Sequence, residues 1–372
     1  MTSKKYKVAV IGCGRMGGFI DNEVIGSSIV TLPFSFGSAF ETCDRTKIVA
    51  GCDTRVEILN HFGTRYGLQS KNLYRDYRKL IEIEQPDIIA IGTQPEQRAE
   101  IIIFAAENGV KAIYSEKTMT ASMTELENVV DAAEQNNVVV NMGCSYRWHP
   151  GFQKVKEIVD SGYLGDLKYM VMSYRNGINQ HGIHALDLAN FINGDVETSW
   201  VQGSVLENTL SLEGDLIRKD PDMIGTVHYK NGVNVTLLVT PFTDAQEFVC
   251  DKGQILVYRG TSYYKGFYNW EIRKLQDNGE LLVDSFPEFK PYSTTLWVIE
   301  DLVNTLDTGK ITRGGIKVAR AGDEQTFSLI ESHIRGGIRV NLPLEDSKIR
   351  LERNLKPRMP LFEPSDSNIN QE

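Results

Sequence analysis

The sequence predicts two domains, a doubly wound α/β domain followed by an α+β domain with an open, mostly antiparallel sheet. A chain of 372 residues is long enough for two or three domains. Its first part alternates unbroken apolar runs with amphipathic helical patterns, which is typical of a parallel sheet covered on both faces. Later strands follow one another without intervening helices, as in an antiparallel sheet. The expected boundaries are 1–148 for the first domain, 149–352 for the second and 353–372 for a polar tail.

Five buried strands are expected in the first domain, because five short runs are apolar and rich in β-branched residues. Amphipathic stretches separate them and predict the crossover helices of a parallel sheet. The strands are expected at 7–11, 47–52, 87–91, 110–114 and 138–142, with two of the helices at 96–107 and 122–135.

The second domain is expected to begin with a helix, a strand and a second helix, for which Asn179 is a good N-cap. Alternating strands then fill residues 199 to 283, and an Asn231-Gly232 pair predicts a hairpin with a type I′ turn. Two more helical patterns close the domain. The helices are expected at 152–161, 180–192, 295–307 and 317–335, and the first strand at 166–175.

The composition narrows the class of function. The net charge is −9 and no basic block is present, which disfavours a nucleic-acid partner. No apolar run reaches the roughly 18 residues that a membrane-spanning helix needs. Five scattered cysteines without a CxxC pair and only six histidines favour neither a disulfide framework nor a metal site. We expect a cytoplasmic enzyme that acts on a small molecule, without a nucleic-acid partner, a membrane or a metal.

A glycine-rich turn, GCGRMG, follows the first expected strand. In such a turn Gly12 permits the tight bend, Gly14 lets the backbone approach a pyrophosphate, and Gly17 lets helix and strand pack closely. The free N–H groups at the start of the next helix face the anion. The motif alone is common, but its place directly after a strand predicts a dinucleotide site that includes Arg15 and Met16.

Asp53 ends the second expected strand, where an acidic side chain holds the adenosine ribose hydroxyls. It lies 36 positions after Gly17, instead of the usual distance of about 20. The excess is a turn-rich insertion at 24–37, which we expect to border the mouth of the active site. A carboxylate repels a 2′-phosphate, so Asp53 favours NAD as the cofactor. Arg55 can accept that phosphate, which keeps NADP open as the alternative.

Several further motifs, in this order and spacing, resemble those of one family of oxidoreductases. They are Thr93-Gln94-Pro95, Glu116-Lys117-Thr118, Tyr146-Arg147, Gly182-Ile183-His184-Ala185-Leu186-Asp187, Glu331-Ser332 and Leu342-Pro343-Leu344. Together with the glycine turn, they resemble the glucose–fructose oxidoreductase / inositol dehydrogenase (Gfo/Idh/MocA) family over about residues 5–346. The Glu-Lys-Thr and Gly-x-His-x-x-Asp segments are far more specific than the glycine turn.

The resemblance implies an N-terminal Rossmann domain and an NAD(P)-dependent enzyme that oxidises a secondary alcohol of a sugar, polyol or glycoside, or reduces the matching ketone. It also implies a homodimer or homotetramer formed through the C-terminal sheet. Two departures stand out. The family's Glu-Lys-Pro is Glu-Lys-Thr here, so we expect a possible cis-proline turn after Lys117 to be lost. Many members carry an aspartate four residues before the catalytic histidine, where this chain has Gln180.

The catalytic candidates are Lys117 and His184. Lys117 follows the fourth expected strand, and its ammonium group there can stabilise a developing alkoxide. The imidazole of His184 can relay a proton near neutral pH. Glu116 is expected at the nicotinamide ribose, and the Thr93-Gln94-Pro95 turn is expected under the nicotinamide half of the cofactor.

The substrate-binding candidates surround the catalytic histidine. Gln180 at i−4 and Asp187 at i+3 share its helical face, and Gln180 is expected to orient a substrate hydroxyl. His181 is a possible substitute, although its side chain is expected to point about 100° away around the helix. Tyr146 and Arg147 follow the fifth strand and can bind hydroxyls or an acidic group. The alternative for this pair is a packing and salt-bridge site between the domains.

Two other functions stay open at this point. One is a glycosidase that uses NAD for oxidation followed by elimination, which would suit an altered acid/base set such as Gln180. The other is a non-catalytic dinucleotide-binding protein that has lost an essential base. Aromatic residues further along the chain are interpreted as sheet packing rather than as a sugar platform; these are Tyr263-Tyr264 and Phe267-Tyr268.

Overall fold

Six parallel strands form the sheet of the N-terminal half, in the order β3-β2-β1-β4-β5-β6. This is the strand order of a Rossmann fold, in which the direction of winding reverses between β1 and β4. The five expected strands are confirmed, and the edge strand β3 was missed because it has only two residues. The strands are β1 (Tyr6–Ile11), β2 (Thr46–Cys52), β3 (Leu73–Tyr74), β4 (Ile88–Ile91), β5 (Ala112–Ser115) and β6 (Val139–Met142).

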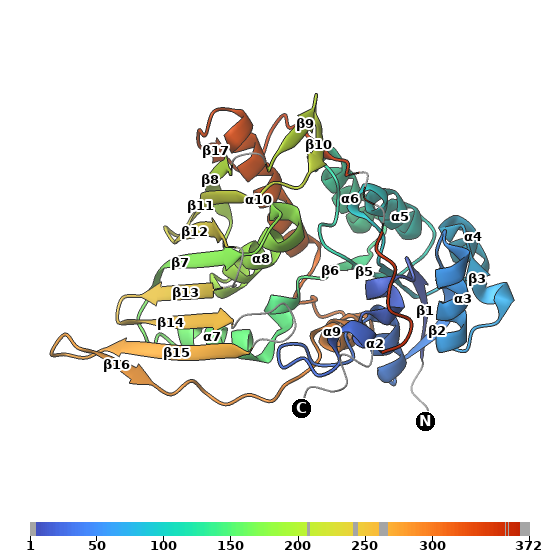
Figure 1. Cartoon of the computed structure of the whole chain (residues 1–372), viewed down its shortest axis with the longest axis horizontal. Helices are drawn as coiled ribbons and strands as arrows, with labels where there is room; N and C mark the ends of the chain where they lie inside the picture. Colours follow the sequence, from blue (N-terminus) through green and yellow to red (C-terminus); the bar gives the residue numbers. More distant parts are fainter. Residues whose placement is uncertain are drawn as a thin grey trace.

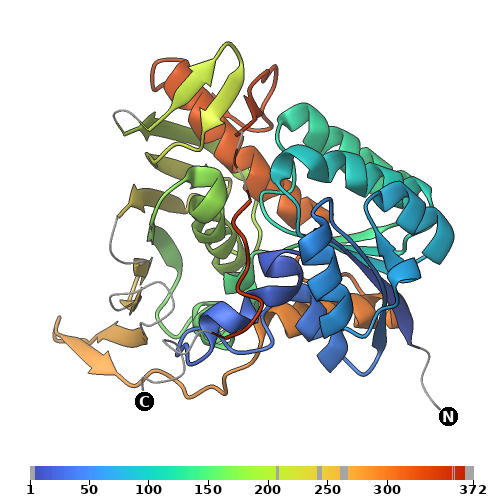
Figure 2. The same cartoon turned by 45° about the vertical axis from the view of Figure 1, so that its right-hand side comes forward.

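Helices cover both faces of this sheet, as Figures 1 and 2 show. They bury its strands so thoroughly that every residue of β4 and β5 is buried. The structure, a computed structural model, describes residues 5–206, 209–240, 245–259, 267–353, 355 and 357–364. The helices of this half are η1 (Arg15–Phe19), α1 (Asp21–Val24), α2 (Phe36–Thr42), α3 (Val56–Arg65), η2 (Ser70–Asn72), α4 (Tyr77–Glu84), α5 (Pro95–Glu107), α6 (Met123–Gln135) and η3 (Ser145–Trp148).

Nine strands form the larger sheet of the C-terminal half, in the order β16-β15-β14-β13-β7-β12-β11-β8-β17. All neighbours pair antiparallel except β7 and β12, which pair parallel. The mostly antiparallel second sheet is therefore confirmed. The strands are β7 (Leu167–Tyr174), β8 (Thr198–Val205), β11 (Met223–Tyr229), β12 (Asn234–Val239), β13 (Ala245–Cys250), β14 (Gly253–Arg259), β15 (Tyr268–Leu275), β16 (Leu281–Asp284) and β17 (Val340–Asn341).

The hairpin between β11 and β12 is present, but its turn is not type I′. A type I′ turn needs positive φ at both central residues, and among Asn231 and Gly232 only Gly232 has it, with φ of 89°. The N–H of Tyr229 donates to Val233 O, which makes the connection longer than two residues. A small sheet of β9 (Ser211–Glu213), β10 (Leu216–Lys219) and β18 (Arg350–Leu351) lies beside the large one.

Two late helices connect the halves. Residues of α9 (Thr294–Thr308), among them Leu296, Ile299 and Leu302, pack in the same apolar cluster as β1. The helix α10 (Ile316–Ile334) contacts α6 and β6 on one side and β8 and α8 (Ile183–Ile192) on the other. The domain boundary at 148/149 stays a prediction, but the chain crosses back to the first sheet after it.

The connection between the sheets begins with α7 (Pro150–Asp160), and η4 (Ile178–Gly182) precedes α8. From residue 353 the chain runs between the two halves toward the N-terminal side, where it is drawn in red in Figure 2. Within the described ranges, no helix is long and apolar enough to cross a membrane.

Candidate functional site

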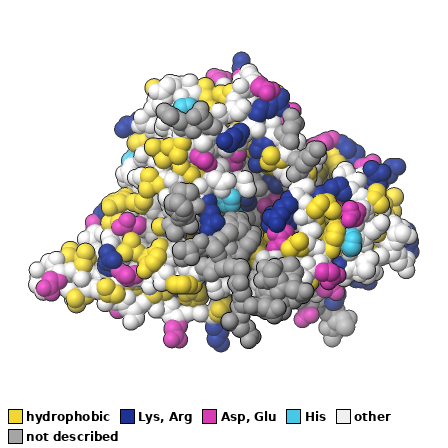
Figure 3. All heavy atoms as spheres, in the orientation of Figure 1, with side chains coloured by type: hydrophobic (Ala, Val, Ile, Leu, Met, Phe, Trp, Pro, Cys, Tyr) yellow, Lys and Arg dark blue, Asp and Glu magenta, His cyan; other side chains and the backbone are white. Residues whose placement is uncertain are grey.

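A cavity of about 500 Å³ lies where the carboxyl ends of β4 and β5 face the second sheet. Lys, Arg and His side chains gather at the centre of this face of the molecule (Figure 3). The glycine turn, the ends of β4 and β5, and residues 179–184 contribute to the lining, as do the facing ends of β14 and β15 and the segment from residue 353. The position agrees with the rule that open α/β sheets bind ligands beyond the carboxyl ends of their strands.

The glycine turn fits a dinucleotide because it leaves no room for side chains. A Cβ atom at Gly12 would lie 2.7 Å from the carbonyl carbon of Gly92, and one at Gly17 would lie 2.1 Å from the oxygen of Gly12. Gly14, Arg15 and Met16 line the cavity. The turn can therefore bring its backbone close to a pyrophosphate, as the sequence predicts.

Asp53 stands at the end of β2 but is covered by a neighbour. Its side chain is 4% exposed, and its Oδ1 accepts from Arg55 N at 2.9 Å and from Arg55 Nε at 3.2 Å. Arg55, and not Asp53, is among the described residues that line the cavity. The side chains predicted to distinguish NAD from NADP thus form one ion pair.

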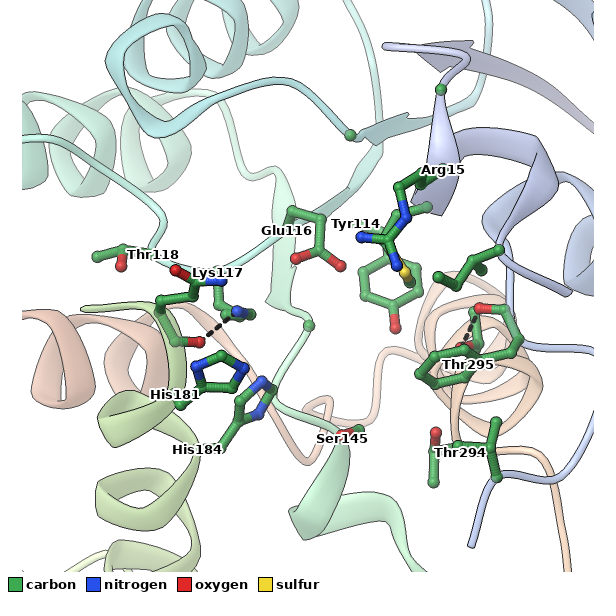
Figure 4. A pocket seen from close by; sticks show the side chains of 18 of the residues that line it. Arg15, Tyr114, Glu116, Lys117, Thr118, Ser145, His181, His184, Thr294 and Thr295 are labelled. Atoms are coloured by element: carbon green, nitrogen blue, oxygen red, sulfur yellow. Dashed lines mark hydrogen bonds between the residues drawn. The ribbon is translucent and has the colours of Figure 1, made fainter. Parts of the chain in front are cut away.

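The residues predicted to bind the nicotinamide half of the cofactor all line the cavity. Glu116 lines the cavity, and so does the turn Thr93-Gln94-Pro95, which ends β4 and starts α5. Four residues of the expected insertion line it too, which places the insertion at the cavity; they are Ile29, Val30, Thr31 and Phe34. In Figure 4, Glu116 lies between Arg15 and Tyr114 on one side and Lys117 with two histidines on the other.

Lys117 is held by the segment that precedes α8. Its Nζ donates to the carbonyl oxygen of Gln180, and Thr118 Oγ1 donates to Asn179 O at 2.8 Å. The Lys117–Thr118 peptide is cis, so the expected loss of a cis turn at this threonine is wrong. Burial lowers the pKa of Lys117, and nearby Arg98 lowers it further, while Glu116 acts in the opposite direction.

His181 and His184 lie side by side next to Lys117 (Figure 4). Burial lowers the pKa of His181 to about 4 and that of His184 well below its usual value, and the charge of Lys117 lowers both. Both imidazoles are therefore neutral at physiological pH. The His184 Nδ1 atom is buried, and no described residue shares a hydrogen bond with it.

The start of this helix differs from the prediction. Residues 178–182 form a π-helical turn whose N–H groups at His181 and Gly182 donate to Gly177 O. Asn179 is therefore inside the turn and is not the N-cap. His181 was expected to point about 100° away from Gln180 around a helix, but it lines the same cavity as Gln180 and His184.

Arg147 and Asp187 are not among the described residues that line the cavity, although both were expected to bind substrate. Arg147 Nη2 lies 3.0 Å from Asp187 Oδ1 and 2.7 Å from Asp195 Oδ1. The Arg147 and Asp187 side chains are only 1% and 2% exposed. This is the packing and salt-bridge alternative. Of the expected pair Tyr146 and Arg147, only Tyr146 is among the described residues that line the cavity. Its ring centroid lies 5.5 Å from that of His184.

Sequence reasoning missed several lining residues on the second sheet and the tail. Arg259 and Tyr268 end β14 and begin β15, and both line the cavity. Tyr268 was interpreted as sheet packing because a strand pattern does not show which aromatic residue stands at a sheet's end. The Tyr263-Tyr264 pair lies outside the described residues. His149, from the turn before α7, is a further lining residue.

The polar tail also contributes to the site. The sequence predicts no role for it, yet residues 353, 355, 357 and 358 line the cavity. The segment is anchored beyond it, where the ring of Phe362 stacks on His61 at 3.7 Å and meets Phe19 edge-on at 5.1 Å. Asn22 Nδ2 donates to the carbonyl oxygens of residues 361 and 362.

Comparisons with known proteins agree with this geometry. Residues 6–144 match the family described as an oxidoreductase family with an NAD-binding Rossmann fold (Gfo/Idh/MocA). Residues 6–144 are thus similar to the NAD-binding domain of this family. Among curated relatives, D-apiose dehydrogenase of Paraburkholderia graminis is 28% identical over 52% of this chain and 52% of that protein. D-apiose dehydrogenase of Rhizobium rhizogenes is 24% identical over 89% and 95%.

Shorter matches include inositol 2-dehydrogenase of Salmonella paratyphi B, 25% identical over 53% of this chain and 60% of that protein. The chain thus spans only about half to two thirds of the length of several curated relatives. A solved inositol dehydrogenase homologue of Azotobacter vinelandii with NADH and myo-inositol has a TM-score of 0.69 at 16% identity, over 91% of this chain and 98% of that one. An Agrobacterium radiobacter oxidoreductase with NAD⁺, L-tartaric acid and magnesium has a TM-score of 0.71 at 18% identity, over 91% and 98%. These structures share the fold.

No three His, Cys, Asp or Glu side chains come together as a metal site in the part of the chain that the structure describes.

Proposed function

We propose that this protein is an NAD-dependent dehydrogenase that oxidises a secondary alcohol of a sugar, polyol or glycoside, or reduces the matching ketone. One observation carries the proposal. Lys117 and two neutral imidazoles converge at one end of a cavity whose other end is the glycine turn. An alcohol placed there would have a cationic hydrogen-bond donor and a proton acceptor beside it. The relatives named as dehydrogenases of apiose and inositol support the substrate class.

The proposed chemistry divides between the two side chains. A nicotinamide cofactor held by the glycine turn would supply the acceptor for the hydride of the carbinol carbon. The Lys117 ammonium donates a hydrogen bond to the carbinol oxygen and stabilises the negative charge that develops on it. His184, neutral because of burial and the nearby Lys117 charge, accepts the hydroxyl proton as that charge develops. Gln180 carries no charge and lines the same end of the cavity, where its amide can orient a neighbouring hydroxyl.

We further propose NAD over NADP. The buried carboxylate of Asp53 at the end of β2 is the support, because its charge opposes a 2′-phosphate. Arg55 would remain on Asp53 and close the ribose pocket from the solvent side. The substrate hydroxyls would lie in the other half of the cavity, where they would contact Tyr146, His181 and Tyr268.

A substrate panel tests the proposal. Aldoses, polyols, sugar acids and glycosides are each supplied with NAD and with NADP, and reduced cofactor is followed by its absorbance. We expect reduction of NAD with at least one secondary alcohol, and none when Lys117 is replaced by Ala. A panel without any reduction, in protein that binds NAD, would contradict the dehydrogenase function. Cleavage of a glycoside without net NADH would instead identify an oxidation–elimination enzyme.

We also propose that a second copy of the chain covers the outer face of the nine-stranded sheet. Large apolar side chains stand on that face with about two fifths of their surface exposed; they are Tyr169 (44%), Ile224 (39%), Leu238 (38%) and Tyr258 (45%). Apolar surface of this kind favours association. Light scattering coupled to gel filtration should give a dimer or tetramer, and Leu238→Glu together with Ile224→Glu should shift it toward the monomer.

A further inference from the structure

The segment that carries Gln180 is held from outside the cavity by a carboxylate of another element. Asp220 follows β10, and its Oδ1 accepts from Asn179 N at 3.0 Å and from Asn179 Nδ2 at 2.9 Å. Its Oδ2 accepts from Gln180 N at 2.8 Å. Three donors on one carboxylate fix the segment's position, because bonds to a charged acceptor are about twice as strong as neutral ones.

The same segment also holds Lys117 and Thr118, through its carbonyl oxygens. In the peptide group between Asn179 and Gln180, the N–H donates a hydrogen bond to Asp220. The carbonyl oxygen of the same peptide group accepts one from the Thr118 hydroxyl at 2.8 Å. The next carbonyl, of Gln180, accepts from Lys117 Nζ. A carboxylate on the N–H of a peptide polarises the group and makes its oxygen a better acceptor.

The fit around Asp220 is close. A Cβ atom at Gly177 would lie 2.5 Å from Asp220 Oδ2, and Gly177 has φ of 65°, so only glycine suits that position. Two residues on, Asp222 Oδ1 accepts from Gly177 N at 2.7 Å, and Pro221 O accepts from Ile178 N at 2.8 Å. The Asp-Pro-Asp segment therefore docks along the π-helical turn, and only Asp220 bonds to the two residues whose carbonyl oxygens receive Lys117 and Thr118.

We propose that Asp220 is the positioning residue of the reaction, which holds Lys117 against the substrate through the peptide groups of Asn179 and Gln180. The inference rests on the proposed function, because it takes Lys117 as the group that stabilises the alkoxide. Asp220 also supplies a negative charge to this end of the cavity, where position 180 carries a neutral amide.

The negative charge of Asp220 also acts on the pKa of Lys117. Asp220 raises the pKa of Lys117, against the dominant lowering by burial. The other titratable or charged groups that act on Lys117, or on which it acts, are Glu116, Cys144, Arg98, His181 and His184. Removal of the Asp220 charge alone should therefore lower the pKa of Lys117, so that its ammonium form is lost at a lower pH.

The test compares Asp220→Asn with the matched control Asp222→Asn. Both remove a carboxylate from the same segment, but only Asp220 is bonded to the residues that hold Lys117. With Asp220→Asn we expect kcat to fall about tenfold, the KM for NAD to stay within about twofold, and the alkaline limb of the pH profile of kcat/KM to move down by about half to one unit. With Asp222→Asn the limb should stay in place. Equal shifts in both variants, or none in Asp220→Asn, would overturn the proposal.

Asp220→Glu keeps the negative charge and lengthens the side chain. It tests the same positioning role if Asp220→Asn does not fold. It should lower kcat while the alkaline limb stays at the wild-type position; a limb that moves would contradict the proposal. A second readout needs no turnover: reductive ¹³C-methylation of lysines and an NMR pH titration, with the Lys117 signal assigned by its loss in Lys117→Ala. Its pKa should be lower in Asp220→Asn than in wild type. That result would stand even if no alcohol were oxidised, so failure of the proposed function is distinguishable from failure of this inference.

Discussion

Replacing Arg147 with Met should cost stability and not substrate binding. The guanidinium is 1% exposed and bonds to Asp187, which is 2% exposed, and to Asp195, which is 39% exposed. The substitution leaves the Asp187 carboxylate buried without a cation. Breaking a buried pair in this way costs about 3–5 kcal/mol of the free energy of unfolding. The control Asp195→Asn, at the exposed partner, should cost at most about 1 kcal/mol.

Urea unfolding at several pH values measures this. Burial already raises the pKa of Asp187, and Arg147 lowers it, so the variant should have a still higher pKa in the folded state. A folded-state pKa above the unfolded one means that the folded protein binds the proton more tightly. The loss of stability should accordingly be smaller at pH 5 than at pH 8. The double variant Arg147→Met/Asp187→Leu should recover much of it. An Arg147→Met protein of normal stability with a raised substrate KM would refute the reasoning.

Three further substitutions address the cofactor. Asp53→Ala should weaken NAD binding more than NADP binding, and Arg55→Ala should weaken NADP binding more than NAD binding. Fluorescence titrations with both reduced cofactors measure these affinities. Equal losses of both affinities in Asp53→Ala would contradict the role of Asp53 in selecting NAD. Phe362→Ala removes the ring that stacks on His61 and anchors a segment lining the cavity. Because an aromatic contact contributes up to about 1.5 kcal/mol, dissociation of NADH should become up to about tenfold faster. Stopped-flow displacement that shows no change in this rate would disprove the anchoring role.

The fold was predictable wherever a pattern is local. The buried strands β1, β2, β4, β5 and β6 follow from unbroken apolar runs, and the glycine turn is specific because a strand leads into it. The two-residue strand β3 is too short for any periodicity to show. Return of α9 to the first sheet was not predictable, since its apolar face does not tell which partner it packs against.

The candidate site was predictable in its motifs and less so in its geometry. Lys117, His184, Gln180 and Glu116 all line one cavity. Arg147 was misplaced because a conspicuous arginine looks the same in a sequence whether it meets a substrate or a buried aspartate. The π-helical turn at 178–182 is bonded to residues 220–222, some forty positions away, and the local sequence does not show that partner.

In the proposed mechanism, Lys117 and His184 carry the chemistry of alcohol oxidation. The single-turnover rate of NADH formation at saturating NAD tests this directly, in wild type, Lys117→Ala and His184→Ala, with the Kd for NAD determined in the same samples. We expect each substitution to lower the rate by about 10²–10⁴-fold, the range for a general acid/base or oxyanion-stabilising group, while the Kd changes little. Rates near that of wild type in both variants would contradict this mechanism.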